Sequence, residues 1–405
     1  MLESRALLAG SFGTLSELIA AHARERPAKR ALVQDDRVLT YAELDAAITR
    51  FAAGLQRAEL QRRAVAIVSA TTVDAVIAYF GALRAGCAAA PLAPSSTPEQ
   101  LAAMVADCGA QLVFVDAETS AVMPPMAAQV LRLDALDHWL PQSAAPLPVT
   151  ISPNDTFNII YSSGTTGTPK GVLHSHGMRW AHIVAFGVGG YSEAITLVAT
   201  PLYSTTTLTS FLPTIAYGGT AVLLSKFDAR RYLELAELQR ATHTMLVPVQ
   251  YQRIMALPDF ARFDLSSFFS KLCTSAPFSA ELKADVVRRW PGMLVELYGM
   301  TEGGGSTVLM AHEHPDKLHT VGRVMPNCEI RLIDEHGREV PRGEIGEVVG
   351  RSSVMMAGYY GRPEQTRAAE WIDAQGTRFI RHGDLGRFDA DGFLTLLGRT
   401  KDMII

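Results

Sequence analysis

The sequence is poor in cysteine and has no long apolar run, and these absences exclude several classes of protein. Its few cysteines are far apart in the 405 residues: Cys87, Cys108, Cys273 and Cys328. None has the Cys-x-x-Cys spacing of a metal or redox site, so we expect buried thiols in a reducing, cytoplasmic compartment. No stretch reaches the ~18 apolar residues of a membrane-spanning helix. Glu3 and Arg5 interrupt the N-terminus, which therefore lacks the pattern of a signal peptide.

A dominant charge is absent as well. The formal net charge is −4, and the Lys and Arg residues are scattered without a basic run, so no nucleic-acid partner is expected. Hydrophobic residues make up 48% of the chain and charged residues 19%, a balance typical of α/β enzymes. A chain of this length exceeds one compact core, which predicts two or three packed subdomains.

Short apolar runs alternate with amphipathic segments through most of the chain. Thr40 and Glu43 form a capping-box pattern at the start of a predicted helix over 41–57. The alternation continues with strands predicted at 65–68, 87–92 and 111–115 and helices at 72–84, 97–108 and 177–186. Such alternation predicts a parallel sheet covered by helices on both faces. Residues 120–150 lack periodicity and are predicted to form a surface linker.

The pattern changes after residue 310. Short strands are predicted at 329–333, 347–350 and 393–397, separated by Gly, Pro and Asp turns, as in a small antiparallel barrel. We therefore predict an α/β protein with two similar βα-layered subdomains packed together and a small antiparallel β-barrel subdomain. The predicted divisions are a first α/β subdomain at 1–190, a second at 191–310, the barrel at 311–398, and a hinge with the start of a further domain at 399–405.

The most informative segment is Tyr161-Ser-Ser-Gly-Thr-Thr-Gly-Thr-Pro-Lys170-Gly-Val, which follows an apolar run predicted to be a strand. Its glycines let backbone N–H groups approach an anion, its hydroxyls add donors, and Lys170 adds a mobile positive charge. This composition predicts a loop that binds a polyphosphate. It is not the P-loop of NTPases, because Pro169 precedes the lysine and Gly171 follows it. A flexible turn is the other interpretation of so many small polar residues.

Three further motifs carry side chains suited to a nucleotide. Tyr298-Gly-Met-Thr-Glu302 follows a predicted strand and offers an aromatic ring for a base, a hydroxyl for a phosphate and a carboxylate for Mg²⁺. Gly383-Asp384 places a carboxylate where it suits the hydroxyls of a ribose. Gly398-Arg399-Thr-Lys-Asp402 offers an arginine for the same ribose or a phosphate. Each motif alone is also typical of a surface turn or a solvated charge cluster.

Together and in this order, the motifs resemble the N-terminal domain of the AMP-forming adenylating superfamily. That superfamily includes acyl- and aryl-CoA ligases, firefly luciferases and peptide-synthetase adenylation domains. The resemblance covers essentially all of the chain and includes the segments 79–86 and 201–204. One segment departs from it: Thr274-Ser-Ala-Pro277 stands where the family usually has Gly-Gly-Ala-Pro, which implies a tighter wall for adenine.

The resemblance implies a role for each motif. The loop would hold the β- and γ-phosphates, with Lys170 as the charged partner, Thr301 would contact the α-phosphate, and Glu302 would bind Mg²⁺ through the phosphates; these three are the implied catalytic residues. Tyr298 would stack on adenine, and Lys401 would lie at the hinge. The implied ATP/AMP-binding residues, of which Asp384 and Arg399 would hold the ribose, are Ser162, Ser163, Gly164, Thr165, Thr166, Gly167, Thr168, Lys170, Thr274, Ser275, Ala276, Pro277, Tyr298, Gly299, Met300, Thr301, Asp384 and Arg399.

The implied acid pocket is apolar and roomy, and it would be lined by Tyr203, Ser204, Thr207, Gly303 and Gly304. Peptide-synthetase domains usually carry Asp where Ser204 stands, so an amino-acid substrate is disfavoured. Many CoA ligases carry His there, so the chain departs from them too. The small residues fit a fatty or bulky aryl or cyclic acid, although a run of glycines is also typical of a flexible loop.

The implied activity is ATP-dependent formation of an acyl-AMP with release of pyrophosphate, followed in the full-length enzyme by thioester formation with coenzyme A. ATP, Mg²⁺ and coenzyme A would be the cofactors. Two alternatives are acyl transfer to a carrier-protein phosphopantetheine, and a truncated module that binds nucleotide and acid without turnover. The chain stops inside an apolar segment at Ile405, so the family's small C-terminal domain is expected to be missing. The sequence leaves open the acid, the thiol acceptor and whether the protein is a homodimer.

Overall fold

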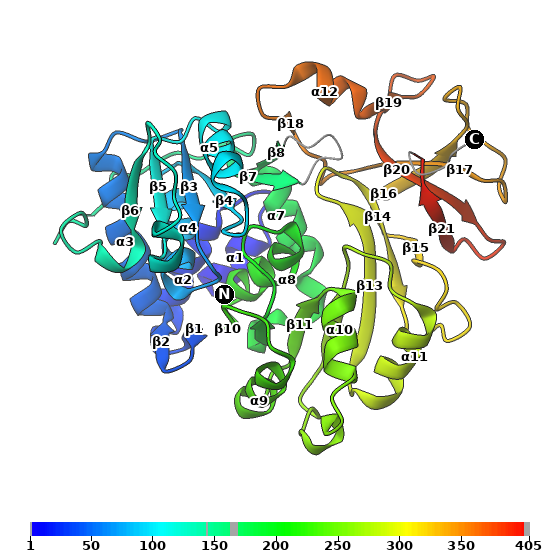
Figure 1. Cartoon of the computed structure of the whole chain (residues 1–405), viewed down its shortest axis with the longest axis horizontal. Helices are drawn as coiled ribbons and strands as arrows, with labels where there is room; N and C mark the ends of the chain where they lie inside the picture. The colour runs from blue at the N-terminus through cyan, green and yellow to red at the C-terminus, as the bar shows by residue number, and fades with distance from the viewer. Residues whose placement is uncertain (1, 143–144, 163–168, 401–405) are drawn as a thin grey trace. The chain divides into compact units, whose positions relative to one another are not determined.

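The computed structural model describes residues 2–142, 145–162 and 169–400 (Figure 1). The chain divides into two compact units. Unit 1 comprises residues 1–227 and 359–361, and unit 2 comprises residues 228–358 and 362–405. This division does not test the predicted boundaries at residues 190, 310 and 398, which stay a prediction.

The helices of unit 1 other than α1 begin at Thr, Ser or Asp residues whose side chains accept from the first turn. Thr40 caps the helix after it: its Oγ1 accepts from the Glu43 N–H at 3.3 Å, and its own N–H donates to Glu43 Oε2 at 2.8 Å. This confirms the predicted capping box. The helices are α1 (Glu3–Leu8), α2 (Leu15–Glu25), α3 (Tyr41–Arg57), α4 (Val73–Arg84), α5 (Pro98–Asp107), α6 (Ala117–Ser120), α7 (His176–Ala185) and α8 (Thr205–Ala216).

The main sheet of unit 1 has the strand order β18-β8-β7-β4-β3-β5-β6. Its strands are β3 (Ala64–Val68), β4 (Ala88–Leu92), β5 (Leu112–Val115), β6 (Gln129–Arg132), β7 (Thr156–Ser162), β8 (Lys170–Ser175) and β18 (Gly358–Tyr359). β6 pairs parallel with β5, so part of the segment 120–150, which was predicted to be a surface linker, is instead an edge strand of this sheet. A second set pairs in the order β9 (Ile195–Val198), β10 (Thr220–Leu223), β1 (Arg30–Gln34) and β2 (Arg37–Thr40).

Both faces of β3 are buried, as the sequence predicts for a central parallel strand. Val65 and Ile67 belong to one apolar cluster, whereas Ala66 and Val68 belong to another. Successive side chains of a strand point to opposite faces, so each cluster covers one face of the sheet. The strand is therefore uniformly apolar rather than alternating.

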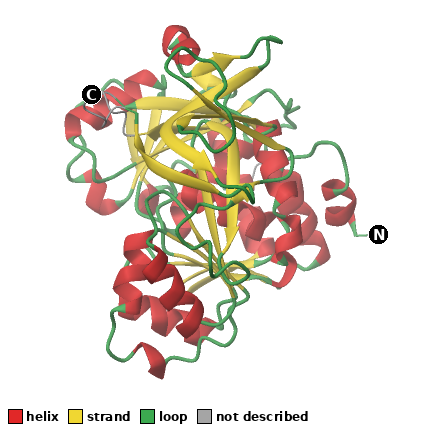
Figure 2. Ribbon diagram, turned by 90° about the vertical axis from the view of Figure 1, so that its right-hand side faces the viewer, coloured by secondary structure: helices red, strands yellow, loops and turns green. Residues whose placement is uncertain are grey.

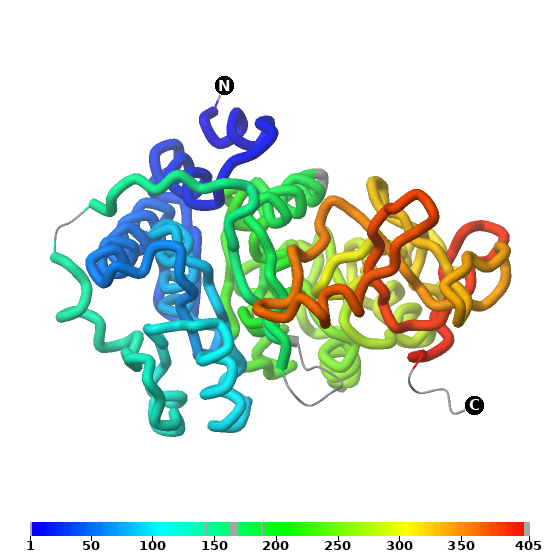
Figure 3. Tube along the Cα trace, turned by 90° about the horizontal axis from the view of Figure 1, so that it is seen from above, coloured from blue at the N-terminus to red at the C-terminus, as the bar shows by residue number. Residues whose placement is uncertain are grey.

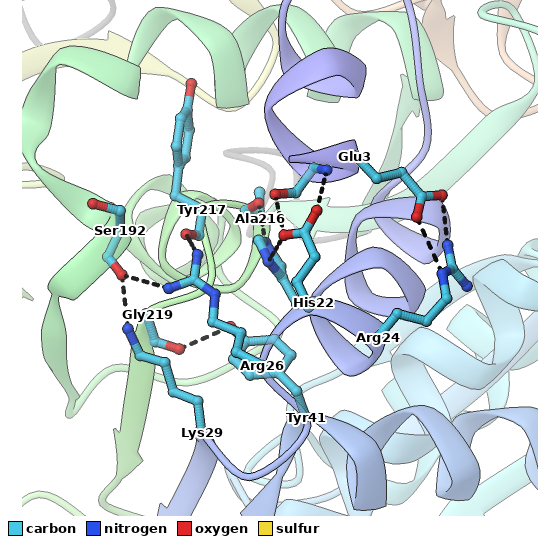
Figure 4. Close-up of polar contacts among 12 residues, drawn as sticks. Glu3, His22, Arg24, Arg26, Lys29, Tyr41, Ser192, Ala216, Tyr217 and Gly219 are labelled. Carbon is cyan, nitrogen blue, oxygen red and sulfur yellow. Dashed lines mark hydrogen bonds and ion pairs between the residues drawn. The ribbon is translucent and has the colours of Figure 1, made fainter. Parts of the chain in front are cut away.

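The first helix of unit 1, α1, lies beside α2 in the chain trace (Figure 3). The N–H and hydroxyl of Ser4, at the start of α1, donate to the Glu25 carboxylate on α2 at 2.8 and 2.6 Å. His22 on α2 is buried, and its Nε2 lies 2.8 Å from the Ala216 carbonyl oxygen at the end of α8 (Figure 4). These contacts, which we call the N-terminal anchor, join segments that are distant in sequence.

Unit 2 combines an α/β layer with a curled antiparallel sheet (Figure 2). The first layer pairs in the order β11 (His243–Leu246), β12 (Ser270–Cys273), β13 (Met293–Met300), β14 (Gly303–Met310) and β15 (Arg323–Val324), and its helices are α9 (Ala229–Gln239), α10 (Pro248–Met255) and α11 (Ala280–Arg289). β11, β12 and β13 are parallel, whereas β14 and β15 are antiparallel.

The curled sheet is the half-barrel of unit 2. It has the order β16 (Cys328–Ile333), β17 (Gly346–Ser352), β20 (Arg378–Phe388) and β19 (Glu370–Ile372), and β21 (Leu394–Arg399) pairs with β20; α12 (Pro363–Ala368) precedes β19. All its pairings are antiparallel. The predicted class, an α/β protein with an additional small antiparallel sheet, is confirmed.

Candidate functional site

The predicted polyphosphate loop connects two antiparallel strands of unit 1. β7 and β8 pair antiparallel, with Ser162 opposite Lys170. The sequence predicted no strand between the loop and the next helix, but Lys170 begins β8. Its side chain is half-buried, and its Nζ lies 5.3 Å from the centroid of the Tyr359 ring. The remaining loop residues, Ser163, Gly164, Thr165, Thr166, Gly167 and Thr168, lie outside the described residues, as does the hinge residue Lys401.

A buried polar cluster connects these two strands to α7, the helix that follows them. Asn158 on β7 stands opposite His174 on β8. Arg179 on α7 donates to both of them, from Nε to Asn158 Oδ1 at 3.2 Å and from Nη2 to His174 Nδ1 at 2.7 Å. Arg179 is 2% exposed, and burial lowers its pKa to about 10. Sequence reasoning missed this cluster, which ties the helix after the loop to both strands that carry it.

Three residues predicted to bind adenine and ribose meet in unit 2. The hydroxyl of Tyr298, on β13, donates to Asp384 Oδ2 on β20 at 2.7 Å. Arg399 Nε on β21 lies 2.9 Å from Asp384 Oδ1, and the two residues are opposite each other across the strands. The Tyr298 ring is half-buried against the apolar core of the half-barrel. Burial and the neighbouring Asp384 carboxylate raise the pKa of Tyr298, so its phenol remains a proton donor.

His382 completes this group, and sequence reasoning gave it no role. Its Nδ1 lies 3.0 Å from the Tyr298 Oη, and its Nε2 lies 2.8 Å from the Gly304 carbonyl oxygen. The ring is 5% exposed, and burial lowers its pKa. Its position directly before Gly383 and Asp384 was the available signal. We call Tyr298, His382, Asp384 and Arg399 the Tyr298 cluster.

The turn between β13 and β14 holds the predicted phosphate and magnesium ligands. Thr301 is half-buried and Glu302 is 8% exposed, so Glu302 lies in a packed turn rather than at the surface. The Glu302 carbonyl accepts from the Met356 N–H at 2.8 Å. Before the turn, Gly299 is exposed and Met300 is half-buried. Substitution of Glu302 therefore affects a packed turn as well as any ligand.

The glycines after Glu302 have a backbone role. Gly303 has φ of 82°, and a Cβ there would lie 2.2 Å from the Val354 carbonyl oxygen. Gly304 has φ of 77°, and its Cβ would lie 2.7 Å from the Ile380 Cβ. These residues form the start of β14 rather than a flexible loop. A side chain at position 303, as in Gly303→Leu, would therefore disturb the backbone, so such a variant cannot test the predicted acid pocket.

The other predicted pocket residues also have local roles. Ser204 caps α8 by accepting from the Thr206 N–H at 3.2 Å. Thr207 is buried and its hydroxyl donates to the Pro201 carbonyl at 2.5 Å. Tyr203 is half-buried. These residues belong to unit 1, so the pocket that they would form with Gly303 and Gly304 stays a prediction.

The predicted adenine wall directly follows β12. Thr274 is half-buried, whereas Ser275, Ala276 and Pro277 are exposed. Ser275 has φ of 85°, a left-handed conformation that favours glycine. The position where the family usually has glycine thus keeps a glycine-like backbone in this chain.

In the part of the chain that the structure describes, no group of three or more His, Cys, Asp or Glu side chains could hold a metal ion. Within residues 2–142, 145–162 and 169–400, no helix is long and apolar enough to cross a membrane.

Comparison with known proteins identifies the family. The AMP-binding enzyme family matches residues 19–360. A feruloyl-CoA synthase of an Amycolatopsis species is 33% identical over 394 residues, covering 95% of this chain and 78% of that protein. An indoleacetate–CoA ligase of Aromatoleum aromaticum is 30% identical over 413 residues, covering 96% and 79%. The chain belongs to the AMP-binding enzyme family, of the acyl/aryl-CoA ligase type.

Solved structures agree with this assignment. The inhibitor-bound N-terminal domain of FACL13 from Mycobacterium tuberculosis has a TM-score of 0.87 and 25% identity, covering 95% of this chain and 99% of that one. The amide bond synthetase McbA from Marinactinospora thermotolerans has a TM-score of 0.86 and 28% identity, covering 97% and 80%. The chain therefore has the fold of an adenylate-forming N-terminal domain.

Proposed function

We propose that this chain uses ATP to activate a carboxylic acid as an acyl-adenylate, with release of pyrophosphate. The contact among Tyr298, Asp384 and Arg399 carries the proposal, because residues implied to bind adenine and ribose come from three strands to hydrogen-bond distance. Membership of the AMP-binding enzyme family supports it. Asp384 would accept from the ribose hydroxyls, and Tyr298 would stack on adenine.

The chemistry needs positioning rather than a protein nucleophile. A carboxylate is a poor acyl donor because its leaving group would be oxide. Its oxygen therefore attacks the α-phosphorus of ATP, the bond from that phosphorus to the pyrophosphate oxygen breaks, and a mixed anhydride remains. The protein lowers the barrier by holding two anions together and neutralising their charge. Lys170 would neutralise the β- and γ-phosphates, and Thr301 would contact the α-phosphate.

Mg²⁺ fits the donor set if the nucleotide supplies most of its ligands. Glu302 offers a hard carboxylate oxygen of the kind that Mg²⁺ binds together with phosphates and water. Among the described residues no all-protein cage competes with this arrangement. When bound, the ion would neutralise charge on the phosphates.

We infer that the acid is a fatty or bulky aryl or cyclic acid. The similar proteins include a feruloyl-CoA synthase, an indoleacetate–CoA ligase and the long-chain-fatty-acid–CoA ligase FadD13 of Mycobacterium tuberculosis. The pocket residues Tyr203, Ser204, Thr207, Gly303 and Gly304 include no carboxylate that would pair an amino group. The acyl group would then pass to coenzyme A in the cytoplasm, and the phosphopantetheine of a carrier protein is the alternative acceptor.

Acid-dependent pyrophosphate release tests the proposed function. The chain is incubated with ATP, Mg²⁺ and one acid at a time: ferulate, indoleacetate, palmitate, or phenylalanine as the amino-acid control. We expect release with at least one of the first three acids and none with phenylalanine. Binding of AMP without release for any acid would favour the nucleotide- and acid-binding module, and absence of both would contradict the proposal.

A second assay identifies the acceptor. The full-length protein is incubated with ATP, Mg²⁺ and the acid that releases pyrophosphate, and coenzyme A, a phosphopantetheinylated carrier protein or a simple amine is added. The amine is included because McbA, which has a similar fold, is an amide bond synthetase. We expect the full-length protein to form a thioester with coenzyme A, and transfer only to the carrier protein or the amine would contradict that acceptor.

A further inference from the structure

Tyr298 has one hydroxyl proton but two acceptors within reach. Its Oη lies 2.7 Å from Asp384 Oδ2 and 3.0 Å from His382 Nδ1. The Gly304 carbonyl can only accept, so His382 Nε2 carries the proton of the neutral ring and Nδ1 has none. Burial lowers the pKa of His382 and keeps the ring neutral at neutral pH. The phenol therefore donates to Asp384 or to His382, but not to both.

A bulge in β20 brings the two acceptors together. The paired positions run from Glu347–Leu385 to Val349–Arg381, so β20 advances four residues where β17 advances two. The extra residues lie around Gly383, which has φ of 72°. A bulge of this kind redirects side chains out of the regular alternation, and here His382 and Asp384 both reach one phenol.

A second bulge supplies the carbonyl that fixes the His382 ring. β13 advances from Tyr298 to Met300 while β14 advances from Thr307 to Gly303. Gly304 lies within this excess, and its left-handed backbone presents its carbonyl to His382 Nε2 at 2.8 Å. The ring is thereby held with Nδ1 toward the phenol.

We propose that His382 is a positioning residue for Tyr298: when the hydroxyls of a bound ribose donate to Asp384, the Tyr298 hydroxyl keeps its proton but turns from Asp384 to donate its hydrogen bond to His382 Nδ1. The inference rests on the proposed nucleotide site. Each added donor weakens the attraction of the carboxylate for the phenol, and the phenol has a second acceptor in place. The Tyr298 ring thus keeps one orientation for adenine before and after the ribose binds.

A double-mutant cycle measured with two nucleotides tests this role. Tyr298→Phe removes only the hydroxyl, and His382→Leu removes both ring nitrogens. Binding of AMP and of 2′,3′-dideoxy-AMP is measured calorimetrically for wild type, both single variants and the double variant. For AMP, His382→Leu should weaken binding about fivefold when Tyr298 is present and not at all in the Tyr298→Phe background, as expected for one lost hydrogen bond. For dideoxy-AMP the effect of His382→Leu should be the same with Tyr298 and with Phe at position 298, because the Tyr298 hydroxyl continues to donate to Asp384.

The outcomes separate this inference from the proposed function. Equal coupling with both nucleotides, or none with AMP, would overturn the role of His382 while leaving AMP binding intact. Failure of the wild-type chain to bind AMP or ATP would overturn the nucleotide site and this role with it.

A measurement on the wild-type chain avoids dependence on folded variants. With histidine labelled at its ring nitrogens, AMP should shift the Nδ1 resonance of His382 toward that of a hydrogen-bonded acceptor, and dideoxy-AMP should not. His22 is the internal control, because its Nε2 also lies 2.8 Å from a carbonyl and its Nδ1 has no hydrogen-bond partner. An unchanged His382 resonance with bound AMP would overturn the proposal.

Discussion

Two buried histidines, one in each unit, share a hydrogen-bond pattern but have different surroundings. His22 Nε2 lies 2.8 Å from the Ala216 carbonyl, and His382 Nε2 lies 2.8 Å from the Gly304 carbonyl. In the N-terminal anchor, the charged groups around His22 already have hydrogen-bond partners (Figure 4). Arg26, for example, donates to the Tyr217 carbonyl at 3.1 Å.

In the Tyr298 cluster, by contrast, the charged side chains are partly exposed to solvent. Asp384 retains 15% exposure of its side chain, and Arg399 retains 61%. The anchor is built on regular helices, whereas the cluster is built on two bulged strands. The same imidazole therefore joins two helices in one unit, whereas in the other unit it contacts Tyr298, which we propose binds a nucleotide. Irregular backbone with spare hydrogen-bonding capacity distinguishes the second case.

The comparison predicts that substitutions at the proposed site affect chemistry, and the largest effect is expected for Lys170→Ala. Removing the charge that would neutralise the phosphates should slow acyl-AMP formation by a factor on the order of 10³. Single-turnover formation of the adenylate measures this, and thermal unfolding checks that the fold persists. Lys226→Ala is the matched control, because Lys226 is an exposed lysine of the same unit. A rate close to that of the control would contradict the role of Lys170.

Asp384→Ala should have the next largest effect. Charge-assisted hydrogen bonds are worth about 1.5–3 kcal/mol each, so the dissociation constant for AMP should rise by about 10–100-fold. The preference for AMP over 2′,3′-dideoxy-AMP should disappear with it. Asp391→Ala is the control, because Asp391 lies in the same half-barrel and pairs with Lys317 at 2.6 Å. Unchanged discrimination between the two nucleotides in Asp384→Ala would remove the ribose from this site.

Regular elements such as α3 and β3 could be predicted from the sequence, whereas the bulged strands β14 and β20 could not. Thr40 and Glu43 act within one turn of chain, so the capping box and its helix could be predicted from local residues. The central strand β3 is uniformly apolar and was predicted within one residue. β14 and β20 were not predicted, because Gly303 and Gly383 are local signals for turns. Their extended conformation depends on pairing with strands distant in sequence.

The candidate site likewise contains some residues that the sequence predicted and others that it did not. Tyr298 and Asp384 stand in motifs that resemble a known family, and the structure brings them together. His382 and Arg179 acquire their contacts only through cross-strand register and helix packing. No spacing rule connects His382 with Gly304, which is 78 residues away. Contacts of this kind can be identified only once the folded structure is known.

Substitutions in the N-terminal anchor should affect stability and leave the chemistry unchanged. Glu25→Gln replaces the carboxylate that accepts two hydrogen bonds from Ser4, and we expect a loss of about 1–2 kcal/mol in the free energy of unfolding. The rate of adenylation per folded molecule should equal that of wild type. Glu3→Gln is the control, because the Glu3–Arg24 pair is exposed and such pairs contribute little. Slower adenylation in Glu25→Gln would break the distinction between the two clusters.

The smallest expected effect is a pH dependence that His22 contributes to stability. Burial lowers the pKa of His22 below its ordinary value of 6.5. Above that value His22 is neutral in the folded and unfolded chain and contributes no slope. As the pH falls below it, the unfolded chain takes up the proton first, so the free energy of unfolding falls by at most ~1.4 kcal/mol per pH unit.

His22→Gln should remove this contribution while keeping an amide that can donate to Ala216. Other buried histidines, such as His176, whose pKa is lowered to about 4, remain in both proteins. The difference in slope between wild type and variant therefore isolates His22. Denaturant unfolding from neutral pH down to about pH 5 measures it, and identical slopes would mean that His22 becomes protonated without cost in the folded chain. The surroundings of His22 would then accept a charged ring, which would contradict the claim that the N-terminal anchor is a closed structural contact unlike the Tyr298 cluster.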